Sequence, residues 1–177
     1  MVMGRILFAE QDGVNVLKFT GDVRVTLGPT IGAFLNSLKE CKEMKSIIID
    51  LTETEGIDST SLGLLAKISL QTQESFHTVP TIVSTNEDIT RILMSMGFDK
   101  VFVIIKEPLA TDAPLGELPV QVANETALRE QVLEAHKVLM GLNEYNRNAF
   151  QDLVVALEHE KHGHPISYKK KRAAGSH

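Results

Sequence analysis

The chain of 177 residues has a single cysteine, Cys41, so an intrachain disulfide is excluded and a reducing compartment is expected. No stretch approaches the uninterrupted apolar run that a membrane helix requires. The segment 1–5 lacks the long apolar core of a signal peptide. A net charge of -5 argues against a nucleic-acid surface. These absences predict a cytoplasmic protein that inserts into no membrane and binds no nucleic acid.

Motifs for catalysis and for metal binding are also scarce. The chain has no Gly-x-Ser-x-Gly elbow, and spacing assigns none of its six histidines as the base of a serine hydrolase. His159, His162 and His164 are loosely spaced and are followed at once by Pro165, which does not favour a native metal site. We therefore predict no catalytic residue, no metal and no cofactor, and a protein that is not an enzyme.

Strand and helix signals alternate over the first 106 residues. The predicted strands are 5–9, 14–20, 46–51, 80–84 and 101–105, and the predicted helices begin near Pro29, Ser59 and Asn86. Asp12-Gly13 between the first two strands is a hairpin signal. This order predicts an α/β fold, in which helices flank a mixed β-sheet with right-handed crossovers.

The stretch around Ser59 is the most informative part of the chain. The apolar run 47–51 predicts a buried strand, and an amphipathic helical pattern starts directly behind Ser59. The Ser59 hydroxyl is therefore expected in or next to the first turn of a helix, where backbone N–H groups are unpaired and the dipole is positive. A serine there can cap the helix, accept a phosphate, or do both. Asp58 is expected to form the turn before it.

The remainder of the chain differs in character. Pro108, Pro114, Gly116 and Pro119 predict a linker or an extended strap over 107–122. Residues 123–162 predict an amphipathic helical extension, either one kinked helix or a hairpin broken at 141–143. Residues 163–177, which include Lys169 to Arg172, are expected to be a flexible, solvated basic tail.

The helical extension has a wide apolar face. Its residues recur at alternating spacings of four and three: Leu128, Val132, Ala135, Leu139, Leu142, Ala149, Leu153 and Ala156. Asn146 interrupts this pattern, whereas Phe150, Val154 and Leu157 widen it. Such a face must pack on the first domain, on itself or on another chain. We favour a role of these helices in binding another chain, and a homodimer formed through them is one possibility.

Three segments of residues 5–105 resemble the STAS family, the fold of bacterial anti-sigma factor antagonists. They are Leu17-Lys18-Phe19-Thr20-Gly21-Asp22, Ile57-Asp58-Ser59-Thr60-Ser61-Leu62-Gly63 and the run from Ile92 to Phe102. The resemblance implies a STAS domain over 1–106, with Ser59 as the serine that accepts phosphate from a partner kinase. Ser61 stands at the family's usual glycine position and narrows the space for a kinase. Arg24 stands where many members have an acid, so Asp22 either replaces that contact or the contact is absent.

The same resemblance implies a function. We expect a non-catalytic anti-sigma factor antagonist whose unphosphorylated form sequesters an anti-sigma factor or a related regulator. A serine kinase would add the phosphate, and a metal-dependent serine/threonine phosphatase would remove it. The expected partner-binding residues are Asp22, Asp58, Thr60, Ser61 and Leu62. The alternative is a STAS scaffold subunit of a membrane transport complex, in which the Ser59-Thr60 region contacts an ATPase.

Overall fold

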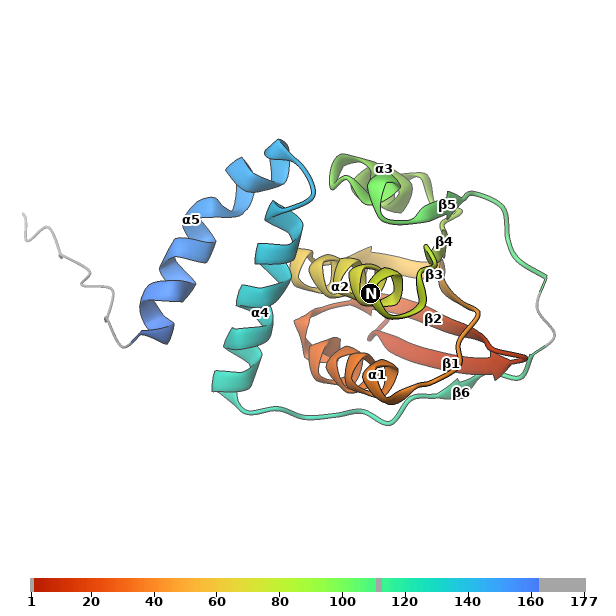
Figure 1. The fold of residues 1–177 in the computed structure, drawn as a ribbon. Coiled ribbons are helices and arrows are strands. Elements are labelled where there is room, and N and C mark those ends of the chain that lie inside the picture. The colour runs from red at the N-terminus through yellow and green to blue at the C-terminus, as the bar shows by residue number, and fades with distance from the viewer. Residues whose placement is uncertain (1, 111–112, 163–177) are drawn as a thin grey trace, which may run out of the picture.

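A computed structural model describes residues 2–110 and 113–162, so the predicted basic tail over 163–177 lies outside the described residues. The chain folds into a six-stranded sheet with strand order β5-β4-β3-β2-β1-β6 (Figure 1). The strands are β1 (Arg5–Gln11), β2 (Val14–Val23), β3 (Ser46–Ile57), β4 (Thr81–Val83), β5 (Val103–Ile105) and β6 (Gly116–Glu117). The helices are α1 (Gly28–Glu40), α2 (Ser59–Phe76), α3 (Glu87–Ser95), α4 (Glu125–Met140) and α5 (Glu144–Lys161). Two 3₁₀ turns, η1 (Val25–Leu27) and η2 (Phe98–Lys100), complete the elements.

The sheet is mixed, as predicted. β1 and β2 form an antiparallel hairpin at Asp12-Gly13, whose φ angles of 54° and 83° suit the tight turn expected from this dipeptide. β2, β3, β4 and β5 are parallel neighbours, and β6 pairs antiparallel with β1 at the other edge. The predicted α/β fold with a C-terminal helical extension is therefore confirmed.

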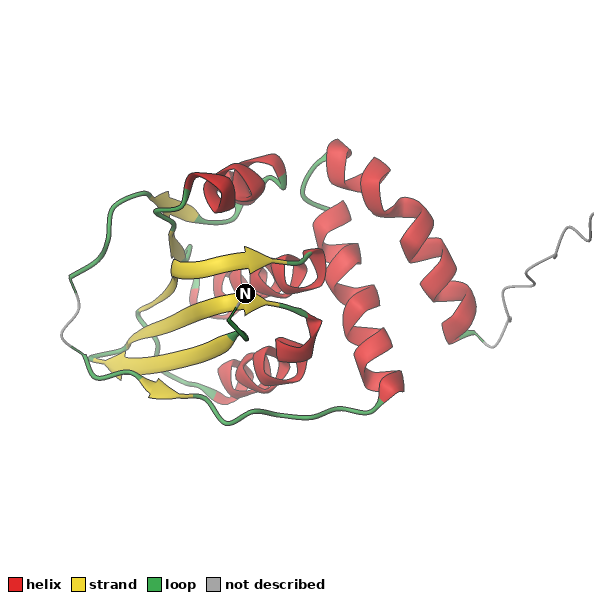
Figure 2. Cartoon of the chain, turned by 180° about the vertical axis from the view of Figure 1, so that it is seen from behind, coloured by secondary structure: helices red, strands yellow, loops and turns green. Residues whose placement is uncertain are grey.

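The hydrophobic core lies between the sheet and the helices α1 and α2. Seen from behind, the strands lie in front of these two helices (Figure 2). Alternate residues of the central strands point into this layer, because successive side chains of a strand face opposite sides. The apolar residues of β2 and β3 that are at most 1% exposed are Leu17, Phe19, Val23, Ile47, Ile49 and Leu51.

The strands depart from their predicted ranges: β1 and β2 run on to Gln11 and Val23, whereas β4 and β5 are shorter than predicted. The largest change is in β3. β3 continues to Ile57 rather than ending at Leu51, because its polar second half pairs with β2 as far as Val23. Thr54 in this half is buried, and its hydroxyl donates to the Phe19 carbonyl at 2.9 Å. Within the predicted linker, β6 adds two residues to the sheet edge, so part of this segment is an extended strap.

The C-terminal extension is a helical hairpin rather than one kinked helix. α4 packs on α2, and α5 packs on the outer side of α4 (Figure 1). Ala135 and Leu139 of α4 are fully buried and belong to the same hydrophobic cluster as the sheet. The extension therefore contributes two side chains to the core of the first domain.

The predicted apolar pattern does not continue from α4 into α5. Leu153, expected on the buried face, is 41% exposed, whereas Asn146, expected to interrupt that face, is 0% exposed. The turn between the helices resets the register, so α5 turns a different side inward. Asn146 donates to the carbonyls of Met96 and Leu139 at 2.8 and 2.9 Å. It thereby adds a side-chain donor to carbonyl groups at the C-terminal ends of α3 and α4.

Candidate functional site

Ser59 is the first residue of α2, and only Asp58 separates it from the end of β3. The N–H of Asp58 donates to the Val23 carbonyl at 3.0 Å, which ties this junction to β2. The predicted position of Ser59, in the first helical turn beyond a core strand, is confirmed. The backbone at Ser59 is therefore positioned by the end of the sheet and not by a long loop.

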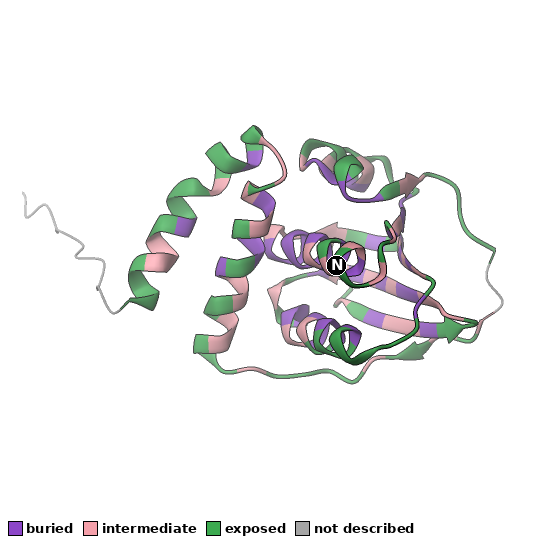
Figure 3. Cartoon of the chain, in the orientation of Figure 1, coloured by how far each residue is buried: buried purple, intermediate pink, exposed green. Residues whose placement is uncertain are grey.

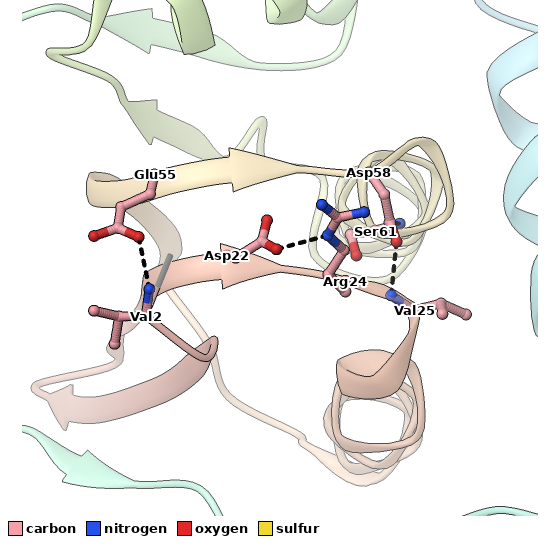
Figure 4. A network of polar contacts seen from close by, with 7 residues as sticks. All are labelled: Val2, Asp22, Arg24, Val25, Glu55, Asp58 and Ser61. Carbon is pink, nitrogen blue, oxygen red and sulfur yellow. Dashed lines mark hydrogen bonds and ion pairs between the residues drawn. The ribbon is translucent and has the colours of Figure 1, made fainter.

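Asp58 caps α2. Its Oδ1 accepts the N–H of Ser61 at 2.8 Å, and its Oδ2 accepts the N–H of Val25 at 2.7 Å (Figure 4). The first bond satisfies a helical N–H that would otherwise lack a partner, and the second fixes the start of η1. Because Asp58 supplies the cap, the Ser59 hydroxyl is not needed to cap the helix and can bond elsewhere.

The Ser59 hydroxyl contacts a histidine of the C-terminal extension. Ser59 Oγ lies 2.8 Å from Nε2 of His136, and Nδ1 of His136 lies 2.6 Å from the Val132 carbonyl. A carbonyl oxygen can only accept, so the Nδ1 nitrogen carries a proton, and in the neutral ring Nε2 is then the acceptor. Ser59 is therefore the donor. The His136 ring is 2% exposed and meets Phe150 edge-on at a centroid distance of 5.0 Å.

The backbones of α2 and α4 approach closely beside this pair. A Cβ atom built on Gly63 would lie 2.2 Å from the Ala135 carbonyl oxygen, so only glycine fits beneath α4 as it is seated. Gln131, one turn earlier on α4, donates to the Gly28 carbonyl at 2.8 Å. α4 is thus attached to the first turns of both α1 and α2.

The predicted partner-binding residues divide into two groups. Thr60, Ser61 and Leu62 are 6%, 0% and 1% exposed, so they face the interior of the protein. Asp22 and Asp58 are half-buried and lie at the same edge as Ser59. The structure therefore brings the predicted residues together, buries these three, and leaves the acidic pair and Ser59 partly open to solvent.

Arg24 balances the acidic residues at this edge. Its Nε donates to Oδ2 of Asp22 at 2.7 Å, and its guanidinium lies between Asp22 and Asp58 (Figure 4). The hydrogen bond to Asp22, and then the charge of Asp22, raise the pKa of Arg24. Arg24, at the position where the family resemblance predicts an acid, therefore pairs with the Asp22 carboxylate.

Ser61 has a buried hydroxyl without a hydrogen-bond partner. Burying an unpaired hydroxyl costs about 1 to 3 kcal/mol. Ser61→Ala is therefore expected to leave the free energy of unfolding unchanged or to raise it by about 1 kcal/mol, as measured by urea denaturation.

Ser69 on the same helix is a matched control, because it is equally buried and its hydroxyl donates to the Val101 carbonyl. Ser69→Ala removes this donor to the Val101 carbonyl and also the hydroxyl that accepts from Nε2 of Gln73 at 2.9 Å, so it should lower the free energy of unfolding by about 1 to 3 kcal/mol. Equal losses for Ser61→Ala and Ser69→Ala would show that the Ser61 hydroxyl is satisfied in solution.

A serine hydroxyl within hydrogen-bond reach of an imidazole is the arrangement that activates a nucleophile. Here the other ring nitrogen is oriented by a backbone carbonyl, and the ring is buried where α4 meets α2. The geometry therefore supports a polar link between two helices. Within residues 2–110 and 113–162, no group of three or more His, Cys, Asp or Glu side chains could hold a metal ion.

His136 is the site residue that sequence reasoning missed. It follows Ala135 directly in the predicted apolar pattern, which was the only signal that it lies near a helix contact. Its partner is 77 positions away, so no local spacing could identify the pair.

Comparison with known protein families identifies the class to which this protein belongs. A sequence profile of the STAS domain matches residues 5–111, more than half of the chain. The protein therefore belongs to the STAS domain family, whose fold its sheet and first three helices show.

One solved structure with partial similarity is that of an anti-sigma factor antagonist from Mycobacterium paratuberculosis. It shares 22% sequence identity, with a TM-score of 0.48, over 59% of this chain and 87% of that one. Comparison with curated protein sequences found no significant match. Over the described residues, no helix combines the length and apolar character needed to span a bilayer.

Proposed function

We propose that this protein is an anti-sigma factor antagonist that works as a phosphorylation-controlled partner switch. Its unphosphorylated form would sequester an anti-sigma factor or a related regulator, and phosphate on Ser59 would release it. The observation that carries the proposal is the position of Ser59 in a STAS-family chain. Ser59 begins α2, while its neighbour Asp58 performs the capping.

A phosphate is electrostatically compatible with this position. It adds about -1.5 to -2 charges, and the N-terminus of a helix favours such an anion. The added charge would sit beside Asp58 and Asp22, only one of which is paired with Arg24. A partner that accepted a neutral hydroxyl would then meet repulsion and a desolvation cost. A loss of ~3 kcal/mol would weaken its binding about a hundredfold.

The other parts of the proposal follow from the same switch. A serine kinase adds the phosphate, a metal-dependent serine/threonine phosphatase removes it, and the protein itself acts in the cytoplasm by binding and not by catalysis. Asp22 and Asp58 contribute partner contacts from the exposed edge. Self-association, if it uses the extension, involves the outer side of α5, where Leu153 and Val155 are 41% and 49% exposed.

Phosphate is expected at Ser59 in protein isolated from cells that contain the cognate kinase. Intact-mass and fragment-ion mass spectrometry should place it there, and Ser59→Ala should abolish it. Thr60→Ala is the matched control, because Thr60 is adjacent and buried and its replacement should leave the modification in place. Phosphate at Thr60 or elsewhere, with Ser59 unmodified, would refute the assignment.

The alternative, a STAS scaffold subunit that contacts a transport ATPase, differs in the same experiment. In that case Ser59 stays unmodified and the protein co-purifies with a membrane ATPase. A third outcome is stable labelling of Ser59 by a fluorophosphonate. This would mean that the Ser59–His136 pair acts as a nucleophile and base, and it would contradict the non-catalytic proposal.

A further inference from the structure

We propose that the α4–α5 hairpin is an intramolecular cap. It covers the start of α2, from Ser59 to Gly63, and must move away before a kinase or a partner can reach Ser59. What the cap controls rests on the function proposed above. That the hairpin covers this face and opens as a unit is independent of that function and can be tested without any partner.

The first support for the cap is the Ser59 hydroxyl itself. Its proton is directed at Nε2 of His136 at 2.8 Å, and the ring beyond it is 2% exposed. A phosphoryl group bonded to Ser59 Oγ needs the space that this imidazole fills. Ser59 is half-buried, and as long as its hydroxyl keeps this bond to His136, the seated α4 stands in the way of phosphate transfer.

The second support is the surface that α4 buries next to Ser59. Gly63 touches the backbone at Ala135, and Leu139 is fully buried one turn further along α4. Thr60 and Leu62, which the family resemblance assigns to partner contact, are also buried, and Leu62 belongs to the central hydrophobic cluster. A partner that docks on this turn of α2 would have to take the place of α4.

The third support is the way in which the hairpin is attached. It is joined to the sheet edge by the strap 118–124, in which Val120 and Val122 are 66% and 92% exposed. At its other end, the turn between α4 and α5 is held by side-chain-to-carbonyl bonds: Asn143 to Ser95, Asn146 to Met96 and Lys100 to Leu142. α5 is exposed along most of its length (Figure 3). The hairpin thus holds to the domain through one face of α4 and the α4–α5 turn, while α5 lies on the outside, and we expect it to open as a unit before the sheet unfolds.

Gly63→Ala is the substitution that tests the cap. Alanine suits the interior of α2, but its methyl group would collide with the Ala135 backbone and push α4 away. The probe is a thiol at position 59, introduced by Ser59→Cys in a chain that also carries Cys41→Ser, and labelled with a maleimide. We expect slow labelling in this parent and labelling about ten- to hundredfold faster after Gly63→Ala.

Gly32→Ala is the matched control. A Cβ at Gly32 also faces α4, but it meets the end of the Gln131 side chain, at 2.6 Å, and not the backbone of α4. That side chain can turn aside at the cost of its bond to the Gly28 carbonyl, so labelling should rise far less than after Gly63→Ala. If all three chains are labelled as fast as the exposed Cys41 of the unmodified protein, Ser59 is not covered and the proposal is wrong.

Hydrogen exchange on the unmodified chain decides the matter even if Gly63→Ala fails to fold. Amides of α4 and α5 should exchange together, and at least about tenfold faster than the most protected amides of β2 and β3. Exchange of all four elements at one common rate would show that the hairpin opens only with global unfolding, which overturns the cap. Failure to find phosphate at Ser59 would leave this result untouched and would instead refute the proposed switch.

Discussion

Replacement of Asp58 by alanine is expected to lower the free energy of unfolding by about 2 to 4 kcal/mol. The variant loses the N-cap of α2 and also leaves the N–H of Val25 without an acceptor. Because these two N–H groups belong to different elements, both the start of α2 and the turn η1 lose support. Urea denaturation followed by circular dichroism measures the change.

Two comparisons sharpen this expectation. Asn124 caps α4 through one exposed bond, to Ala127 at 2.8 Å, so Asn124→Ala should cost only about 1 kcal/mol. Asp58→Asn keeps one acceptor oxygen but turns an amide N–H₂ group toward the second donor, so its loss should fall between the two. If Asp58→Ala and Asn124→Ala destabilise the protein equally, the bond to Val25 contributes nothing.

Leu139→Ala should have an effect of similar size on the hairpin. Leu139 is 0% exposed and belongs to the central hydrophobic cluster, so its truncation leaves a cavity between α4 and the domain. The expected loss is about 2 to 5 kcal/mol in the free energy that holds the hairpin in place. Hydrogen exchange of the amides of α4 reports this loss directly.

Leu153→Ala is the control for the same change of side chain on the other helix. Leu153 is 41% exposed on α5, so its truncation should change amide protection by no more than about 0.5 kcal/mol. The sequence pattern alone assigns both leucines to one buried face. Equal losses for the two variants would favour that single face over the hairpin.

The strands and helices of the first domain were predictable because each carries its own local signal. The buried run 47–51, the Asp12-Gly13 turn and the Asn86 cap depend only on neighbouring residues, and the structure has all three. The polar half of β3 was missed because its pairing with β2 and the burial of Thr54 depend on the sheet, and not on a hydrophobic pattern.

The part of the site that lies at the start of α2 was predictable, whereas the part on α4 was not. Ser59 at the start of α2 follows from the strand-to-helix junction, and Asp58 at the turn follows from residue preference. His136 belongs to a helix whose position on the domain is set by tertiary packing. The tight contact at Gly63 is also invisible in the sequence, because glycine inside a helix has several possible causes.

Because the strap keeps the hairpin attached to the domain, the hairpin competes with a free partner for the same surface of α2. An extended chain over 118–124 reaches at most about 25 Å, so a released hairpin stays close to the face it left. Short tethers of this kind produce effective concentrations on the order of millimolar. A free partner at micromolar concentration competes against that local excess, which outnumbers it about a thousandfold. The strength of the α2–α4 contact would therefore set the partner concentration at which the proposed switch responds.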